Sequence, residues 1–178
     1  MFIIWATIVL VLLMILFFIM RWLHFRQLTK ELATIFESFE KPYSMTYSSR
    51  GPYHWRIEID HTIILCKLFH IGRNDNIVIT NPVTWIKARK SEPIKIENRL
   101  LGVKKFLQTA DEVREEAKKT VHTVAILHPD PLQIRQYINE NEMIIVDINK
   151  KVYNYYFFST STLEKGFQQL LLQDHQKK

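Results

Sequence analysis

The sequence predicts an N-terminal transmembrane helix followed by a single α/β sandwich domain. An uncharged apolar run at residues 2–20 precedes segments in which apolar residues recur every second residue or every three to four residues. These two periods are typical of strands and of amphipathic helices. At 178 residues and 47% hydrophobic content, the chain suffices for one ordinary domain once the apolar run is set aside. We expect an anchor at residues 1–24, a cytoplasmic α/β domain at residues 25–174 and a frayed tail at residues 175–178.

The apolar run FIIWATIVLVLLMILFFIM would extend about 28 Å as a helix, close to the ~30 Å hydrocarbon thickness of a bilayer. No basic residue precedes it and no small-residue cleavage site follows it, so the pattern indicates a retained anchor rather than a cleaved signal. Arg21, Arg26 and Lys30 follow the run. The positive-inside rule therefore predicts a single-pass protein of the cell membrane, with its N-terminus outside and its domain in the cytoplasm.

After the anchor, the periodicity predicts a helix, three strands, a helix and a strand, then an extension of helix, two strands and helix. The expected segments are a helix at 25–40, strands at 43–48, 54–65 and 76–80, a helix at 96–119, a strand at 120–127, a helix at 130–138, strands at 142–148 and 151–158, and a last helix capped by Ser161 and Glu164. The strands at 120–127 and 142–148 would form a parallel β-α-β unit. Residues 83–98 fit either two short strands or an extended excursion.

The stretch HWRIEIDHTIIL at residues 54–65 places Glu58 and Asp60 on the polar face of a strand, where solvent gives way to core. The order of elements, together with Ile59-Asp60-His61 before an apolar run, resembles the nuclease-related domain (NERD) family of the restriction-endonuclease-like fold, over residues 28–172. The resemblance implies a metal-dependent nuclease. In that family the aspartate and the glutamate of a Glu-x-Lys motif hold Mg²⁺, and the lysine positions the attacking water.

The chain departs from this pattern at the second half of the motif. If residues 76–82 form the third strand, Thr80 and Pro82 stand where the glutamate and the lysine are expected. Asp60 then remains as the candidate metal ligand, with Glu58 and Lys87 as replacements that would complete a catalytic site. The resemblance thus implies a nuclease-like domain that has lost activity, unless these replacements restore it.

Basic residues gather between residues 87 and 105. This segment carries seven basic residues against two acidic ones, so most of the net charge of +6 lies here. Basic side chains next to the stacking ring of Trp85 are typical of nucleic-acid binding, whereas a tethered basic segment also suits anionic lipid, and a solvated surface has the same composition. The candidate nucleic-acid-binding residues are Trp85, Lys87, Arg89, Lys90, Lys95, Arg99, Lys104 and Lys105.

Other chemistries are not indicated. The chain has four glycines and no Gly-rich phosphate loop, and its histidines lack the spacing of a zinc site. The single Cys66 excludes an internal disulfide. Two hypotheses remain. One is a membrane-tethered, nuclease-like domain that binds nucleic acid; the other is a non-enzymatic, membrane-anchored interaction or scaffold protein. Docking of the domain on anionic lipid is a third possibility.

Overall fold

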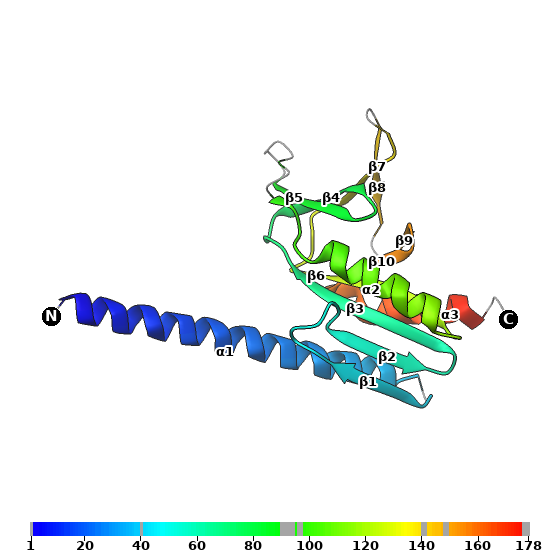
Figure 1. The fold of residues 1–178 in the computed structure, drawn as a ribbon, viewed down its shortest axis with the longest axis horizontal. Helices are drawn as coiled ribbons and strands as arrows, with labels where there is room; N and C mark the ends of the chain where they lie inside the picture. Colours follow the sequence, from blue (N-terminus) through cyan, green and yellow to red (C-terminus); the bar gives the residue numbers. More distant parts are fainter. Residues whose placement is uncertain are drawn as a thin grey trace. The chain divides into compact units, whose positions relative to one another are not determined.

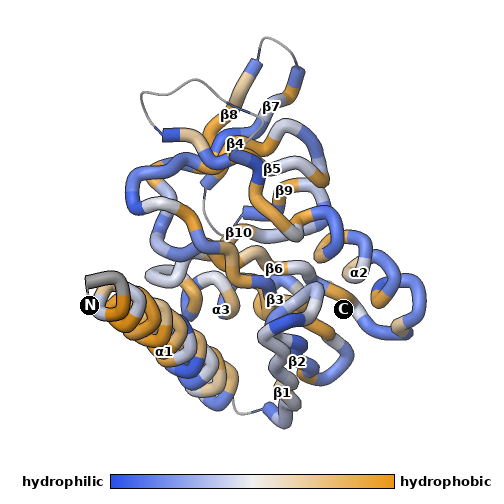
Figure 2. Tube along the Cα trace, turned by 60° about the vertical axis from the view of Figure 1, so that its left-hand side comes forward, coloured by the Kyte–Doolittle hydropathy of each residue, from blue (hydrophilic) through white to orange (hydrophobic). Residues whose placement is uncertain are grey.

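The N-terminal part of the chain is one long helix in the computed structural model, which describes residues 2–39, 41–89, 95, 98–139, 142–147 and 150–175. Helix α1 (Phe2–Glu37) contains neither proline nor glycine and runs without a break. Figure 2 shows hydrophobic residues along most of it. Among the described residues, this is one helix long and apolar enough to cross a membrane, and its most apolar window is not buried. A helical N-terminal anchor fits these properties.

The chain divides into two compact units, Met1–Glu40 and Lys41–Lys178, and the second unit contains two sheets (Figure 1). The six-stranded sheet has the order β1-β2-β3-β6-β10-β9, with bounds Tyr43–Tyr47, Trp55–Ile59, Thr62–His70, Thr120–His128, Tyr155–Ser159 and Lys151–Val152. The four-stranded sheet has the order β5-β4-β7-β8, with bounds Thr84–Arg89, Asp75–Asn81, Ile134–Tyr137 and Met143–Val146. The helices are α2 (Val103–Glu116), the short 3₁₀ helix η2 (Thr160–Thr162) and α3 (Leu163–His175). The predicted mixed α/β class is confirmed.

The centre of the six-stranded sheet is the parallel pair β3 and β6, in register from Thr62 opposite Thr120 to His70 opposite His128. Both strands are apolar on both faces because both faces are covered. Phe106 of α2 and Phe157 of β10 belong to one buried cluster together with residues of the four-stranded sheet. Phe158, the next residue of β10, packs on Phe167 of α3 instead. Helices α2 and α3 therefore cover opposite faces of the six-stranded sheet.

The predicted helix at residues 130–138 is wrong, because Ile134–Tyr137 forms strand β7. Its apolar residues fit a helical spacing, but so short a run cannot separate helix from strand, and pairing with β4 and β8 decides the outcome. The predicted parallel β-α-β unit is wrong for the same reason. Strand β6 is parallel to β3 and β10, whereas β7 and β8 form an antiparallel hairpin in the other sheet.

Further boundaries differ from the prediction. The helix expected at 96–119 is α2, which begins at Val103 and ends at Glu116. The segment 54–65 is two strands rather than one, and the segment 151–158 is likewise divided into β9 and β10. The open segment 83–98 contains β5, while residues 90–94, 96 and 97 lie outside the described residues. The last helix is preceded by η2, whose capping box joins Ser159 and Thr162 instead of Ser161 and Glu164. Residues 176–178 of the expected tail also lie outside the described residues.

Candidate functional site

Asp60 occupies a hairpin turn. Ile59 pairs with Thr62, so Asp60 and His61 form the two-residue loop between β2 and β3. The backbone of Asp60 has a φ of 50°, a left-handed conformation that aspartate tolerates better than most residues. Its exposed carboxylate accepts a hydrogen bond from the Lys41 ammonium at 2.9 Å. Aspartate therefore suits this turn conformation, and its carboxylate forms an ion pair with Lys41.

Glu58 lies on β2 with both carboxylate oxygens engaged by cations. Oε1 accepts from Arg56 Nε at 2.9 Å, and Oε2 accepts from Lys119 Nζ at 2.9 Å. The hydrogen bond from Lys119, followed by that from Arg56, lowers the pKa of Glu58. Glu58 is thus held as a carboxylate between two positive groups, which compete with any metal ion for its oxygens.

The residues proposed for Mg²⁺ and catalysis are not brought together. Lys87 lies on β5 of the four-stranded sheet, opposite Ile77, whereas Glu58 and Asp60 belong to the six-stranded sheet or its turn. Within the described part of the chain, no group of three or more His, Cys, Asp or Glu residues could hold a metal ion. A Mg²⁺ site needs several converging oxygen ligands, and the described residues do not supply them.

Trp85 is a core residue, which corrects its assignment as a stacking ring. Its side chain is 0% exposed in the cluster between the two sheets. The indole Nε1 donates to the Pro82 carbonyl and to the Tyr155 hydroxyl, each at 3.3 Å. The ring centroids of Trp85 and Tyr155 lie 5.0 Å apart. Because β5 and β10 belong to different sheets, this contact joins them, and the indole face is not available to a base.

The other basic candidates differ in how far their side chains are exposed to solvent. Lys87 is half-buried, whereas Arg89, Lys95, Arg99, Lys104 and Lys105 are exposed, and Lys90 lies outside the described residues. The backbone of Arg99 forms a bridge to Ile86, so the chain leading into α2 runs beside β5. Lys104 and Lys105 stand in the first turn of α2.

Lys67 is a basic residue that the sequence did not single out, although it is the only charged residue in the apolar run TIILCKLF. It lies on β3, and its ammonium donates to the Pro52 carbonyl at 2.6 Å. A Cβ added to Gly102, the residue that caps α2, would lie 3.4 Å from both Cε and Nζ of Lys67. Burial, and then the positive charge of Lys105, lower the pKa of Lys67.

We call Lys67, Arg99, Lys104 and Lys105 the α2 basic cluster. The first turn of α2 contains no acidic residue, and Gly102 provides no side-chain cap. Cations at a helix N-terminus oppose the helix dipole and destabilise the helix. An anion bound there is stabilised both by the dipole and by the cations. Leu101, directly before Gly102, is 86% exposed. This arrangement favours an anionic partner with an apolar component.

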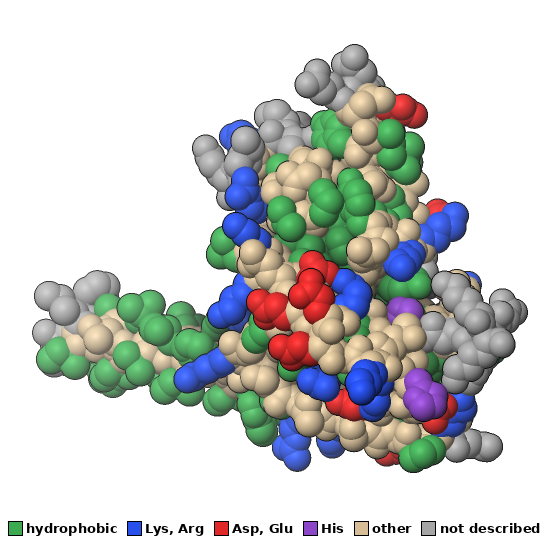
Figure 3. Space-filling view, turned by 45° about the vertical axis from the view of Figure 1, so that its right-hand side comes forward, with side chains coloured by type: hydrophobic (Ala, Val, Ile, Leu, Met, Phe, Trp, Pro, Cys, Tyr) green, Lys and Arg blue, Asp and Glu red, His purple; other side chains and the backbone are tan. Residues whose placement is uncertain are grey.

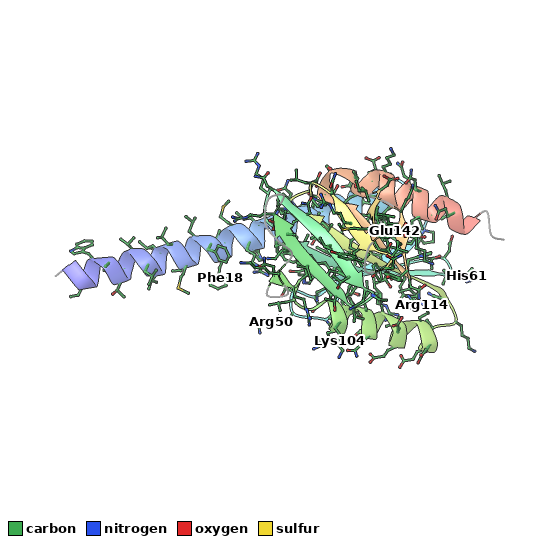
Figure 4. The ribbon with its side chains drawn as sticks, turned by 90° about the horizontal axis from the view of Figure 1, so that it is seen from above. Phe18, Arg50, His61, Lys104, Arg114 and Glu142 are labelled. Carbon is green, nitrogen blue, oxygen red and sulfur yellow. The ribbon has the colours of Figure 1, made fainter. Side chains whose placement is uncertain are left out.

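The Asp60 turn and the α2 basic cluster lie at opposite ends of α2. The Thr120 N–H, just beyond the C-terminal end of α2, donates to the His61 carbonyl at 2.9 Å. The 14 residues of α2 span about 20 Å. Figure 4 shows the same separation between His61 and Lys104, with Arg114 between them. The acid that the resemblance selects and the basic surface therefore do not form one site. Comparison of the chain with protein-family models, with curated proteins and with solved structures finds no match to any of them.

Proposed function

We propose that this is a non-enzymatic, membrane-anchored protein whose α/β domain docks on anionic lipid headgroups through the α2 basic cluster and Leu101. The observation that carries the proposal is the joint exposure of Leu101 and of the lysines in the first turn of α2. Cations bind the lipid phosphates, and a projecting leucine enters the apolar boundary beneath them.

The electrostatics of the cluster support an anionic ligand. Burial, and then the positive charge of the nearby Lys105, lower the pKa of Lys67. Both stand at the positive end of the α2 dipole. Such an arrangement costs stability in the free domain. A bound phosphate removes that cost, since it pairs with the lysines and accepts from the N–H groups of the first helical turn.

The anchor supports a bilayer as the partner. A domain joined to a membrane helix stays near the lipid surface, so weak docking contacts act at high effective concentration. Arg21, Arg26 and Lys30 favour a cytoplasmic domain, and the cytoplasmic leaflet carries the anionic lipids. A cysteine at the exposed Leu172 tests this orientation. We expect a membrane-impermeant maleimide to label Leu172→Cys only after the cells are permeabilised, and labelling of intact cells would reverse the topology.

Hydrogen exchange of the full chain in lipid nanodiscs tests the docking. We expect amides between residues 99 and 107 to exchange more slowly when phosphatidylserine is added to neutral lipid, because the docked cluster is shielded from water. Lys104→Glu with Lys105→Glu should abolish this protection. Lys118→Glu, at the other end of the same helix, is the matched control and should preserve it. Equal exchange in neutral and anionic nanodiscs would contradict the proposal.

A second candidate is a catalytically degenerate, nuclease-like domain that binds nucleic acid. The order α1, β1, β2, β3, α2, β6 favours it, since helix, three strands, helix and strand follow one another if the β4–β5 hairpin counts as an insertion. Strand β3 would then be the third strand. It carries Lys67, with Leu65 two residues earlier where the resembled family has a glutamate. The α2 basic cluster would contact backbone phosphates without a stacking Trp85.

Binding to single-stranded DNA or RNA by the full chain in neutral nanodiscs separates the two candidates. The nucleic-acid candidate predicts an affinity that falls steeply with salt and that Lys104→Glu weakens. The lipid candidate predicts only weak, nonspecific nucleic-acid binding. Its affinity should be too low to displace the domain from phosphatidylserine nanodiscs. Tight nucleic-acid binding that survives lipid docking would point to a different surface.

A further inference from the structure

Strand β8 is an exposed apolar edge. It ends the four-stranded sheet, and its residues Met143, Ile144 and Ile145 are 39%, 41% and 63% exposed. Figure 3 shows hydrophobic side chains gathered over this sheet. Strand β8 pairs with β7 in continuous register, from Ile134 opposite Val146 to Tyr137 opposite Met143. Its other edge thus presents backbone N–H and C=O groups that can pair with a further strand.

The other three edges of the two sheets differ from β8. Strand β1 alternates Ser44 and Thr46 with its apolar residues, and β9 has two residues. Strand β5 carries Lys87 and Arg89, and the backbone of Arg99 already bridges to it. Polar or basic residues, short length and a covering segment are the usual protections of an edge. The sequence MIIV of β8 has no charge and no proline. Among the residues that the structure describes, nothing gives this edge the protections that the other edges have.

Both faces of β8 are apolar. The register places Ile144 on the side of Ile134 and the core, and it places Ile145 on the outer side. On that outer side, Val78, Ile86 and Ala88 form a small apolar cluster against which Tyr137 packs. An added strand with apolar residues on both faces would extend the core on one side and this cluster on the other.

Acidic residues bracket the apolar stretch. Glu142 directly precedes β8 and Asp147 directly follows it, and both are exposed. Glu142 accepts a hydrogen bond from the Asn139 amide at 3.2 Å, and Asp147 forms a surface ion pair with Lys150 at 2.6 Å. Pairing of two copies of β8 in full antiparallel register would set Glu142 of each copy opposite Asp147 of the other, which is unfavourable for like charges. The same acids oppose contact with an anionic bilayer. Exposed contacts of this kind are weak. A strand with a basic residue at each end would therefore match both acids in competition with Lys150 and Asn139.

We propose that β8 binds an extended segment of a partner protein, with about four apolar residues bracketed by Lys or Arg, by adding it as a fifth strand to the four-stranded sheet. Backbone hydrogen bonds along β8 supply affinity, while Glu142 and Asp147 select the charge at the ends of the added segment. This site is separate from the α2 basic cluster, and it does not depend on lipid docking.

A pair of peptides tests this proposal on the full chain in neutral-lipid nanodiscs. The probe is Lys-Val-Ile-Val-Ile-Lys with a fluorescent label, and its counterpart has Glu at both ends. We expect the Lys-bracketed peptide to bind at least about tenfold more tightly than the Glu-bracketed one. Glu142→Lys with Asp147→Lys should reverse this preference. Because both residues are exposed, the folded domain should tolerate these changes, which thermal unfolding verifies.

Matched controls keep the result specific to β8. Thr46→Lys adds a charge to the β1 edge and should leave binding of the Lys-bracketed peptide unchanged. Ile145→Pro should abolish binding if the backbone of β8 pairs with the peptide. Equal affinity for both peptides, binding that is insensitive to these β8 substitutions, or concentration-dependent self-association through β8 would each overturn the proposal.

Discussion

The Lys67 ammonium group lies directly against Gly102, the residue that caps α2, so that a Cβ at position 102 would stand 3.4 Å from Lys67 Nζ. Gly102 has a φ of 79°, in the left-handed region that favours glycine, and this conformation turns the chain from Leu101 into the helix. The contact brings a lysine of β3 to the N-terminal turn of α2, where Lys104 and Lys105 follow. Three positive side chains thus meet the positive end of a helix dipole.

Replacing Lys104 with glutamate should stabilise the domain while it weakens docking. A negative charge in the first turn of α2 complements the helix dipole, so we expect the free energy of unfolding to rise by about 0.5 kcal/mol. Denaturant unfolding of the full chain in detergent measures this. Lys118→Glu, beyond the C-terminal end of α2, should not stabilise. A loss of stability in Lys104→Glu would mean that the cluster is not in electrostatic conflict with the helix.

Replacing Trp85 with phenylalanine should change stability and leave lipid docking intact. The substitution removes the indole donor to Pro82 and Tyr155, and we expect a loss of about 1–2 kcal/mol in the free energy of unfolding. Trp85→Ala should cost about 3–5 kcal/mol because it also leaves a cavity between the sheets. Thermal unfolding and the nanodisc exchange assay separate the two effects. A selective loss of ligand binding in a fully stable Trp85→Phe variant would show that the ring acts on a ligand.

Glu58→Gln should lower stability at neutral pH but not in acid. Lys119 and Arg56 lower the pKa of Glu58 from its ordinary value of 4.5, so the charged pairs contribute stability above that pH. The contribution disappears as the pH falls through the lower pKa of the folded state. Since the side chain is 30% exposed, we expect at most about 1 kcal/mol. Denaturant midpoints of both proteins from pH 7 downward should converge, whereas a constant difference would exclude the ionic origin.

Cys66 should not react with thiol reagents in the folded protein. Its side chain is 0% exposed on β3, and burial raises the pKa of its thiol, so thiolate is scarce. We expect a maleimide to label native protein very slowly and unfolded protein completely, as measured by mass spectrometry. Rapid labelling of the native chain would mean that β3 opens. The inertness of Cys66 also lets a cysteine introduced elsewhere be labelled alone.

The sequence predicts the long apolar helix and the α/β class because their signals are local. An uncharged run of 19 residues needs no tertiary information, and buried strands such as β3 and β6 are continuous apolar runs. The helix predicted at 130–138 fails because Ile134 and Tyr137 have a spacing that suits one helical face, whereas in β7 they lie on opposite faces of the strand. Pairing with β4 and β8, which the local pattern does not specify, selects the strand.

The site could be predicted only in part for similar reasons. The basic excess before and within α2 is visible in the composition. Composition does not tell which side chains are buried, so Trp85 looks like a stacking ring until its contact with Tyr155 of β10 is known. Asp60 looks like a strand residue because a two-residue turn leaves no gap in the periodicity. Lys67 reaches Gly102 across the fold, and no local pattern indicates that contact.

The most direct test of lipid docking follows residue 101 itself. In the full chain, an environment-sensitive fluorophore is attached to Leu101→Cys. It labels this cysteine alone because native Cys66 is buried. The labelled protein is then placed in nanodiscs of neutral lipid with or without phosphatidylserine. We predict emission that shifts to the blue only with phosphatidylserine and that returns in high salt. The same emission in both lipids, with a label at Leu172→Cys as the reference for an undocked position, would contradict the account.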